Sequence, residues 1–167
     1  MKKHIIIYFI LILFTNCNPL KSNKSLDPLT KDQINGELIY KRITKETNYK
    51  KYKMWPGHEG FKEGQSPHGR IHRIFINDIL YNSLPNKSKI APIGSIIIKE
   101  NYDIEKQLKG LTVMVKVKDF NPKINNWYWV SYDNNGNTVL SGKVPFCSDC
   151  HSGKIDNDYI IVRPLDK

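Results

Sequence analysis

The feature that most constrains this chain is a short motif near its end, Cys147-Ser148-Asp149-Cys150-His151. Two thiols and an imidazole at this spacing form the attachment motif for c-type haem. Each cysteine can form a thioether to a vinyl group of the porphyrin, and His151 then lies beneath the iron as its proximal ligand. The motif therefore predicts one haem c, bound covalently through Cys147 and Cys150, with His151 as the metal ligand.

The same cysteine pair has three other interpretations. A redox-active dithiol normally follows a strand and opens a helix, whereas Gly142-Lys143-Val144-Pro145 before this motif is typical of a loop. A structural zinc site needs a fourth ligand, usually from a second Cys or His pair at short spacing, and no such pair follows His151. A disulfide would close too short a loop to stabilise a fold much. Haem attachment is the interpretation that we favour over these alternatives.

The N-terminus has the pattern of an export signal. Lys2 and Lys3 precede an apolar run at residues 5–14, and two polar residues separate this run from Cys17. The run is too short to cross a bilayer, since a transmembrane helix needs about 20 residues, so cleavage is expected. The segment is similar to bacterial lipoprotein signals, which are cut just before a lipidated cysteine. Phe14 and Asn16 depart from the usual pattern, so an ordinary signal peptide with a free Cys17 remains an alternative.

The three cysteines fit a lipoprotein that is exported. If Cys17 carries lipid and the other two bind haem, no odd thiol is left in an oxidising compartment. We therefore predict a signal peptide at residues 1–16, a polar and proline-punctuated tether at residues 17–30, and a haem domain at residues 31–167. The predicted location is the periplasmic side of a bacterial membrane, to which the lipid on Cys17 anchors the domain.

The chain is basic, with 26 Lys and Arg against 16 Asp and Glu and a net charge of +10. Removing Lys2 and Lys3 with the signal lowers this to about +8. The lysines are scattered, no nucleic-acid fold or dense basic helix is recognisable, and export also argues against nucleic acid. Two interpretations remain: a solvated basic surface, or docking to an acidic electron-transfer partner.

The chain beyond the tether has the length of one ordinary domain. Residues 29–54 predict a helix with an apolar stripe, ended by Trp55-Pro56-Gly57, and residues 78–84 predict a second, short helix. At residues 111–118 apolar residues alternate with others, which predicts a strand with one buried and one exposed face. Strand patterns occur at residues 70–77, 94–100, 111–118, 127–132 and, after a turn at 133–137, 138–141. The predicted class is α+β: a single domain rich in antiparallel β-sheet, with a few helices and the haem motif on a C-terminal loop.

Five segments in this order carry a resemblance to the cytochrome P-460 family. They are residues 48–55, 67–77, 94–100, 126–129 and the motif at 147–151. The similarity covers about residues 37–165. It implies a β-sheet-rich domain with a late haem motif, often dimeric, so a homodimer is one expectation. The family includes periplasmic enzymes that oxidise hydroxylamine, and the related beta-type cytochromes c-prime, which bind gases such as nitric oxide.

The resemblance also singles out a lysine. In the hydroxylamine-oxidising relatives a lysine from a Lys-Glu pair at a strand end is bonded covalently to the haem macrocycle, and the matching residue here is Lys99, followed by Glu100. The alternative is an ordinary exposed lysine at a strand end.

His68 and His72 match positions that look like distal-pocket residues in the same relatives, where one is aromatic and one basic. This chain has histidine at both. Residues four apart on a strand face the same side, so both rings can line one cavity. Each imidazole is then either a sixth iron ligand or a proton acceptor. The alternatives are a turn at Pro67-His68-Gly69 and a core or surface His72, and His58 is expected to be exposed.

Two classes of function follow. In the first, an enzyme oxidises hydroxylamine or a similar small nitrogenous substrate at the iron, with Lys99, His68 and His72 as candidate catalytic residues. In the second, the haem binds nitric oxide or carbon monoxide, or passes electrons, without enzymatic turnover.

Overall fold

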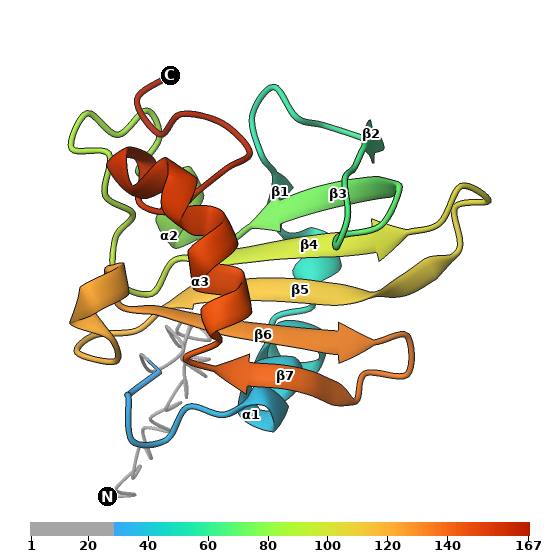
Figure 1. Cartoon of the computed structure of the whole chain (residues 1–167), viewed down its shortest axis with the longest axis horizontal. Helices are drawn as coiled ribbons and strands as arrows, with labels where there is room; N and C mark the ends of the chain where they lie inside the picture. The colour runs from blue at the N-terminus through green and yellow to red at the C-terminus, as the bar shows by residue number, and fades with distance from the viewer. Residues whose placement is uncertain (1–28) are drawn as a thin grey trace, which may run out of the picture.

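Seven strands form one antiparallel sheet in the computed structural model, which describes residues 29–167. The strand order is β1-β3-β4-β5-β6-β7, and β2 pairs with β3 beside β1 (Figure 1). The strands are β1 (Lys53–Met54), β2 (Lys62–Glu63), β3 (Ile71–Ile76), β4 (Ile96–Tyr102), β5 (Leu108–Lys116), β6 (Trp127–Asp133) and β7 (Thr138–Gly142). With three α-helices, this confirms the α+β class. The predicted signal peptide, Cys17 and most of the tether lie outside the described residues.

The three α-helices are short. One lies near the start of the described residues, one follows β3, and one lies near the C-terminus. They are α1 (Gly36–Lys41) with a π-helical continuation (Arg42–Glu46), α2 (Asp78–Tyr81) and α3 (Pro145–His151), and 3-10 turns occur at Tyr49–Lys51, Pro122–Ile124 and Ser152–Asn157. Within residues 29–167, no helix has the length and apolar character needed to cross a membrane.

The long helix predicted at residues 29–54 is wrong at both ends. Asn35 caps α1 by accepting a 2.8 Å hydrogen bond from the backbone N–H of Leu38, so the helix begins there. Asn48 then adopts a left-handed conformation with φ 51°, which ends the helical segment. The remaining residues form a 3-10 turn and β1. The short helix predicted at residues 78–84 is confirmed as α2, with Asn77 as its cap.

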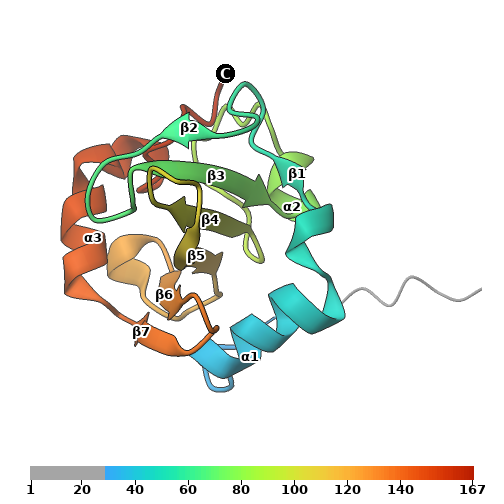
Figure 2. The same cartoon turned by 90° about the vertical axis from the view of Figure 1, so that its right-hand side faces the viewer.

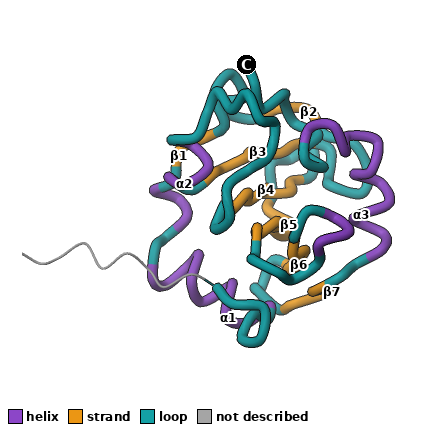
Figure 3. Tube along the Cα trace, turned by 90° about the vertical axis from the view of Figure 1, so that its left-hand side faces the viewer, coloured by secondary structure: helices purple, strands orange, loops and turns teal. Residues whose placement is uncertain are grey.

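Each face of the sheet is covered by a different part of the chain. Ile39 and Ile43 pack with the core on one face. Val144 and Cys147, from the region of α3, pack with the C-terminal residues on the other face. Figure 2 shows α3 and α1 on different sides of the strands, and Figure 3 shows the same arrangement from the opposite direction.

The strand predicted at residues 111–118 is present as β5, but its second face is not exposed. Leu111, Val113 and Val115 lie in the core beneath α1, as the alternation predicts. On the other face Met114 is 8% exposed and Lys116 is 3% exposed. The prediction of a half-buried strand is therefore wrong, because α3 and the C-terminal segment cover this face.

The other predicted strands are confirmed within two residues as β3, β4, β6 and β7. The turn between β6 and β7 is formed by Asp133, whose side chain accepts hydrogen bonds from the backbone N–H groups of Asn135 and Asn137, both at 2.9 Å. The antiparallel return of β7 on β6 follows from this turn.

Candidate functional site

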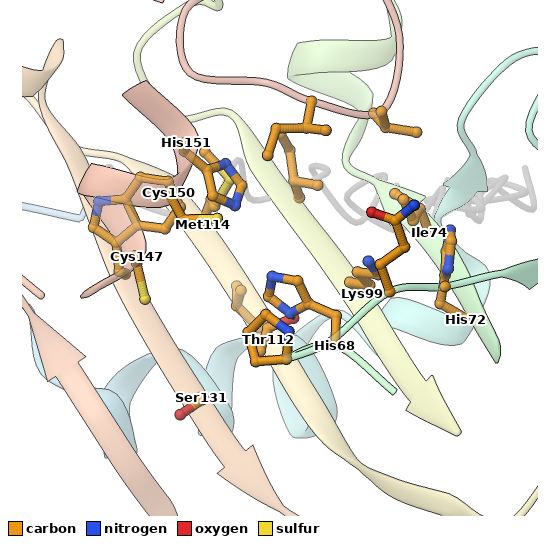
Figure 4. Close-up of a pocket in the computed structure, with 18 of the residues that line it drawn as sticks. His68, His72, Ile74, Lys99, Thr112, Met114, Ser131, Cys147, Cys150 and His151 are labelled. Atoms are coloured by element: carbon orange, nitrogen blue, oxygen red, sulfur yellow. The ribbon is translucent and has the colours of Figure 1, made fainter. Parts of the chain in front are cut away.

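The motif at residues 147–151 lies in helix α3, not in the loop that the sequence predicted. Pro145 occupies the first turn, where its missing N–H costs no helical hydrogen bond. The backbone N–H of Cys147 donates to the carbonyl of Val144 at 3.0 Å, which closes that turn. On a helix, residues three and four apart share a face, so Cys147, Cys150 and His151 project together. All three line one cavity (Figure 4), and both cysteines are free thiols.

The cavity has a volume of about 570 Å³, within the range of about 300–1,000 Å³ that is usual for cofactor sites. Part of its wall is a row of cross-strand neighbours on one sheet face: Ile74, Lys99, Thr112 and Ser131. Most of the remaining lining is apolar, including Ile97, Val113, Met114, Trp129, Val130, Leu140, Phe146, Ile160, Ile161 and Val162. An apolar slot with two thiols and an imidazole at one side fits a covalently attached porphyrin.

His151 is oriented by a backbone hydrogen bond. Its Nδ1 donates to the carbonyl oxygen of Tyr159 at 2.7 Å, which leaves Nε2 without a proton. A histidine that binds a metal commonly donates its other ring N–H to a carbonyl in this way. Burial lowers the pKa of His151, so the ring is held in the neutral form that can bind iron. Trp129 packs beside it, with 4.7 Å between the ring centroids.

Lys99 extends into the same cavity from β4 (Figure 4). It lies in the middle of the strand, because β4 continues to Tyr102, so the expected position at a strand end is wrong. Its side chain is half-buried, and burial lowers the pKa of its amine to about 8. Glu100 points to the opposite sheet face, where it is fully buried and binds Lys50 and Arg73. The side chain of Lys99 thus lies in the cavity, whereas that of Glu100 lies in the core on the opposite face of the sheet.

His68 and His72, the two predicted distal residues, both line the cavity. His72 lies on β3 and is 6% exposed, whereas His68 lies in the turn before β3. The expectation that one strand carries both is therefore wrong, and the turn alternative holds for His68. Burial, followed by the charge of Lys99, lowers the pKa of each ring to about 4. Both imidazoles are consequently neutral at neutral pH.

A sequence model of the family described as Cytochrome P460 matches residues 47–162, which is more than half of the chain. The chain belongs to the cytochrome P460 family. Membership of this family makes the protein a haem protein, and the cysteine pair in α3 of this P460 domain is consistent with covalent attachment of the haem. No curated protein matches the chain.

One residue of the P460 domain that sequence reasoning placed wrongly is His58. It was expected to be exposed, but it lines the cavity and its Nε2 lies 2.8 Å from Nε2 of His72. The two rings stack with 5.1 Å between their centroids. One ring donates and the other accepts, so the pair joins a buried imidazole to one nearer the surface. The fourteen-residue separation across β2 left no local pattern that could have predicted this contact.

A buried ion pair between Lys116 and Asp158 in the P460 domain lies next to Tyr159, whose carbonyl orients His151. The amine of Lys116 lies 2.7 Å from Oδ1 of Asp158, and Asn125 and the backbone N–H of Ala91 each donate to the same carboxylate at 2.8 Å. Asp158 and Tyr159 both have left-handed backbone conformations, with φ 55° and 63°. The ion pair therefore fixes the turn that presents the Tyr159 carbonyl to His151. No motif in the sequence predicted it.

Proposed function

We propose that this protein is an exported haem c enzyme that oxidises hydroxylamine or a similar small nitrogenous substrate at the haem iron. The observation that carries this proposal is that Lys99 lines the same cavity as Cys147, Cys150 and His151. When bound, haem supplies an iron that can bind a small ligand and accept its electrons. Each thioether forms by addition of a cysteine S–H across a vinyl group, so attachment needs no external oxidant.

The residues around the cavity support removal of protons from such a substrate. Oxidation of hydroxylamine releases protons as well as electrons, so an acceptor is needed for each. His72 is neutral and its Nε2 contacts His58, which is the more exposed of the two rings. We assign this pair as the proton route from the cavity toward solvent. The electrons leave to a redox partner, and the basic character of the chain favours an acidic one.

The state of the Lys99 amine supports a bond to the haem edge. With a pKa of about 8 the amine is partly neutral near neutral pH, and only the neutral form is nucleophilic. Joining its nitrogen to a ring carbon removes one hydrogen atom from each, so an oxidant of the peroxide class has to accept two electrons and two protons. Such a bond would change both the electronics and the planarity of the macrocycle.

Replacing Lys99 tests the proposed function. Lys99→Leu should abolish a red-shifted Soret band and hydroxylamine oxidation, because the amine that modifies the macrocycle is gone, while the thioether-bound haem stays. The measurements are an optical spectrum and a steady-state assay with an artificial electron acceptor. Lys87→Leu, at an exposed lysine, is the matched control and should change neither. An unchanged spectrum and rate in Lys99→Leu would contradict the proposal.

The second candidate function is gas binding or electron transfer without turnover. The observation that favours it is that the rings of His68 and His151 lie near each other, with 6.2 Å between their centroids and their planes nearly perpendicular. A wild-type protein that shows neither a red-shifted Soret band nor hydroxylamine oxidation would favour this candidate.

We also propose that Cys17 is lipidated after cleavage of residues 1–16, and that the domain is held on the periplasmic side of a bacterial membrane. Support comes from the sequence pattern, since Cys17 lies outside the described residues. Multiple acyl chains on one residue are sufficient for stable anchoring. Cys17→Ser should move the protein from the membrane to the soluble fraction, whereas Cys147→Ser should leave it on the membrane. A wild-type protein recovered entirely in the soluble fraction would contradict the anchor.

A further inference from the structure

We infer that His68 is the sixth ligand of the haem iron, bound opposite His151, and that small molecules reach the iron by displacing it. This rests on the proposed attachment of haem at Cys147 and Cys150. In the resting protein His68 would close the iron site, and a competing ligand that displaces His68 would open it.

The distance between the two rings fits a shared metal. Since a metal–imidazole bond is about 2.0 Å long, two imidazoles bound to one metal from opposite sides have ring centres about 6 Å apart. The centroids of His68 and His151 are 6.2 Å apart, with the ring planes at 89°. Figure 4 shows His151 projecting from α3 and His68 from the segment before β3 into the same space.

In both histidines Nδ1 has a hydrogen-bond partner, and Nε2 is the nitrogen that faces a metal. Nδ1 of His151 donates to the Tyr159 carbonyl, and Nδ1 of His68 lies 3.4 Å from the hydroxyl of Thr112. When Nδ1 of His68 donates to this hydroxyl, Nε2 is the nitrogen available to a metal in each ring. The neutral form of His68, which burial favours, is the form that binds metal.

The backbone on both sides of His68 is fixed, which sets the direction of its side chain. The N–H of His68 donates to the carbonyl of Gln65 at 2.9 Å, and the N–H of Arg70 donates to that of Tyr102 at 3.1 Å. Between these bonds, Gly69 has φ 75°, and a Cβ added there would lie 2.7 Å from the Tyr102 carbonyl oxygen. The turn is thus pressed against the end of β4. Because His68 lies outside the paired residues of β3, its ring can swing away without breaking the sheet.

Two other nitrogen bases line the cavity, and the structure makes each a poorer candidate. Nε2 of His72 is already engaged with His58 at 2.8 Å. Lys99 is placed on the sheet, paired with Thr112 and Ile74 in the cross-strand row, and we assign its amine to the haem edge. Lys99 nevertheless remains the competitor that the experiment has to separate from His68.

The test is made on purified holoprotein by optical and electron paramagnetic resonance spectroscopy. Wild type should be six-coordinate and low-spin, and His68→Ala should be five-coordinate and high-spin, with added imidazole restoring the low-spin signal. The apparent affinity of the ferrous protein for carbon monoxide should rise at least about tenfold in His68→Ala, because the open fraction no longer limits binding. His72→Asn, which removes the neighbouring histidine, should stay low-spin.

Two results would overturn the inference. One is a high-spin, five-coordinate wild-type protein, which needs no variant to detect. The other is a low-spin signal that persists in His68→Ala and disappears in Lys99→Leu, which would make the lysine amine the ligand. Neither result affects covalent attachment, which is read separately from the mass of the denatured protein, so failure of this inference is distinguishable from failure of the proposed haem site.

Discussion

Replacing both Cys147 and Cys150 with serine, in a chain that also carries Lys99→Leu, is expected to abolish covalent haem attachment completely. A serine hydroxyl cannot replace the thiol in forming a thioether, and the two cysteines of α3 are the only ones among the described residues. The single variants should each retain one thioether and a reduced yield of holoprotein. The measurement is haem-dependent peroxidase staining after denaturing electrophoresis, in which only covalently bound haem stays with the chain.

The control for this prediction is Ser148→Ala, which lies between the cysteines and supplies no thiol. Its side chain donates only to the carbonyl of Pro145 at 3.1 Å, within the same helix. It should stain as strongly as wild type. Staining that persists in the double serine variant and is lost when Lys99→Leu is added would support the bond to Lys99, whereas staining that persists with all three replacements would contradict attachment through Cys147 and Cys150.

The second large effect is expected at Asp158. Asp158→Ala leaves the amine of Lys116, which is 3% exposed, as a buried charge without its partner. Breaking a buried ion pair in this way costs about 3–5 kcal/mol, a large part of the roughly 5–15 kcal/mol that stabilises a typical domain. The measurement is the free energy of unfolding of the holoprotein in urea, and the midpoint should fall sharply.

Two further variants separate the charge effect from a loss of packing. Asp149→Ala removes an exposed carboxylate from α3 and should change the free energy of unfolding by less than about 0.5 kcal/mol. The double replacement Lys116→Met with Asp158→Leu should recover much of the stability lost in Asp158→Ala, since it leaves no unpaired charge. If the double variant is as unstable as Asp158→Ala, the ion pair is not the reason for the loss.

The parts of the fold that the sequence predicted correctly are those set by local pattern. β-Branched and aromatic residues located β3 and β4, and alternation located β5 and β6, because successive side chains of a strand point to opposite faces. The Asn and Gly residues of the turn after Asp133 predicted the return of β7. The motif at Cys147, Cys150 and His151 was recognised from its spacing, and this spacing puts all three side chains on one face of α3 although a loop was expected there.

The parts that could not be predicted depend on contacts between distant segments. The alternation over residues 111–118 placed Lys116 on the exposed face, but Lys116 is buried with Asp158, which lies 42 residues away in the sequence. The contact between His58 and His72 likewise requires the loop before β2 to fold back on β3. The periodic pattern also predicted too long a first helix, because periodicity does not reveal that Asn48 adopts a left-handed conformation.

We expect Cys147 and Cys150 to hold one haem covalently in the cavity between α3 and the sheet. Intact-mass spectrometry of the purified wild-type protein under denaturing conditions tests it most directly. The expected mass is that of the mature chain plus that of one haem, stable to acid. Haem that extracts into acidic organic solvent and leaves a chain of unmodified mass would contradict it.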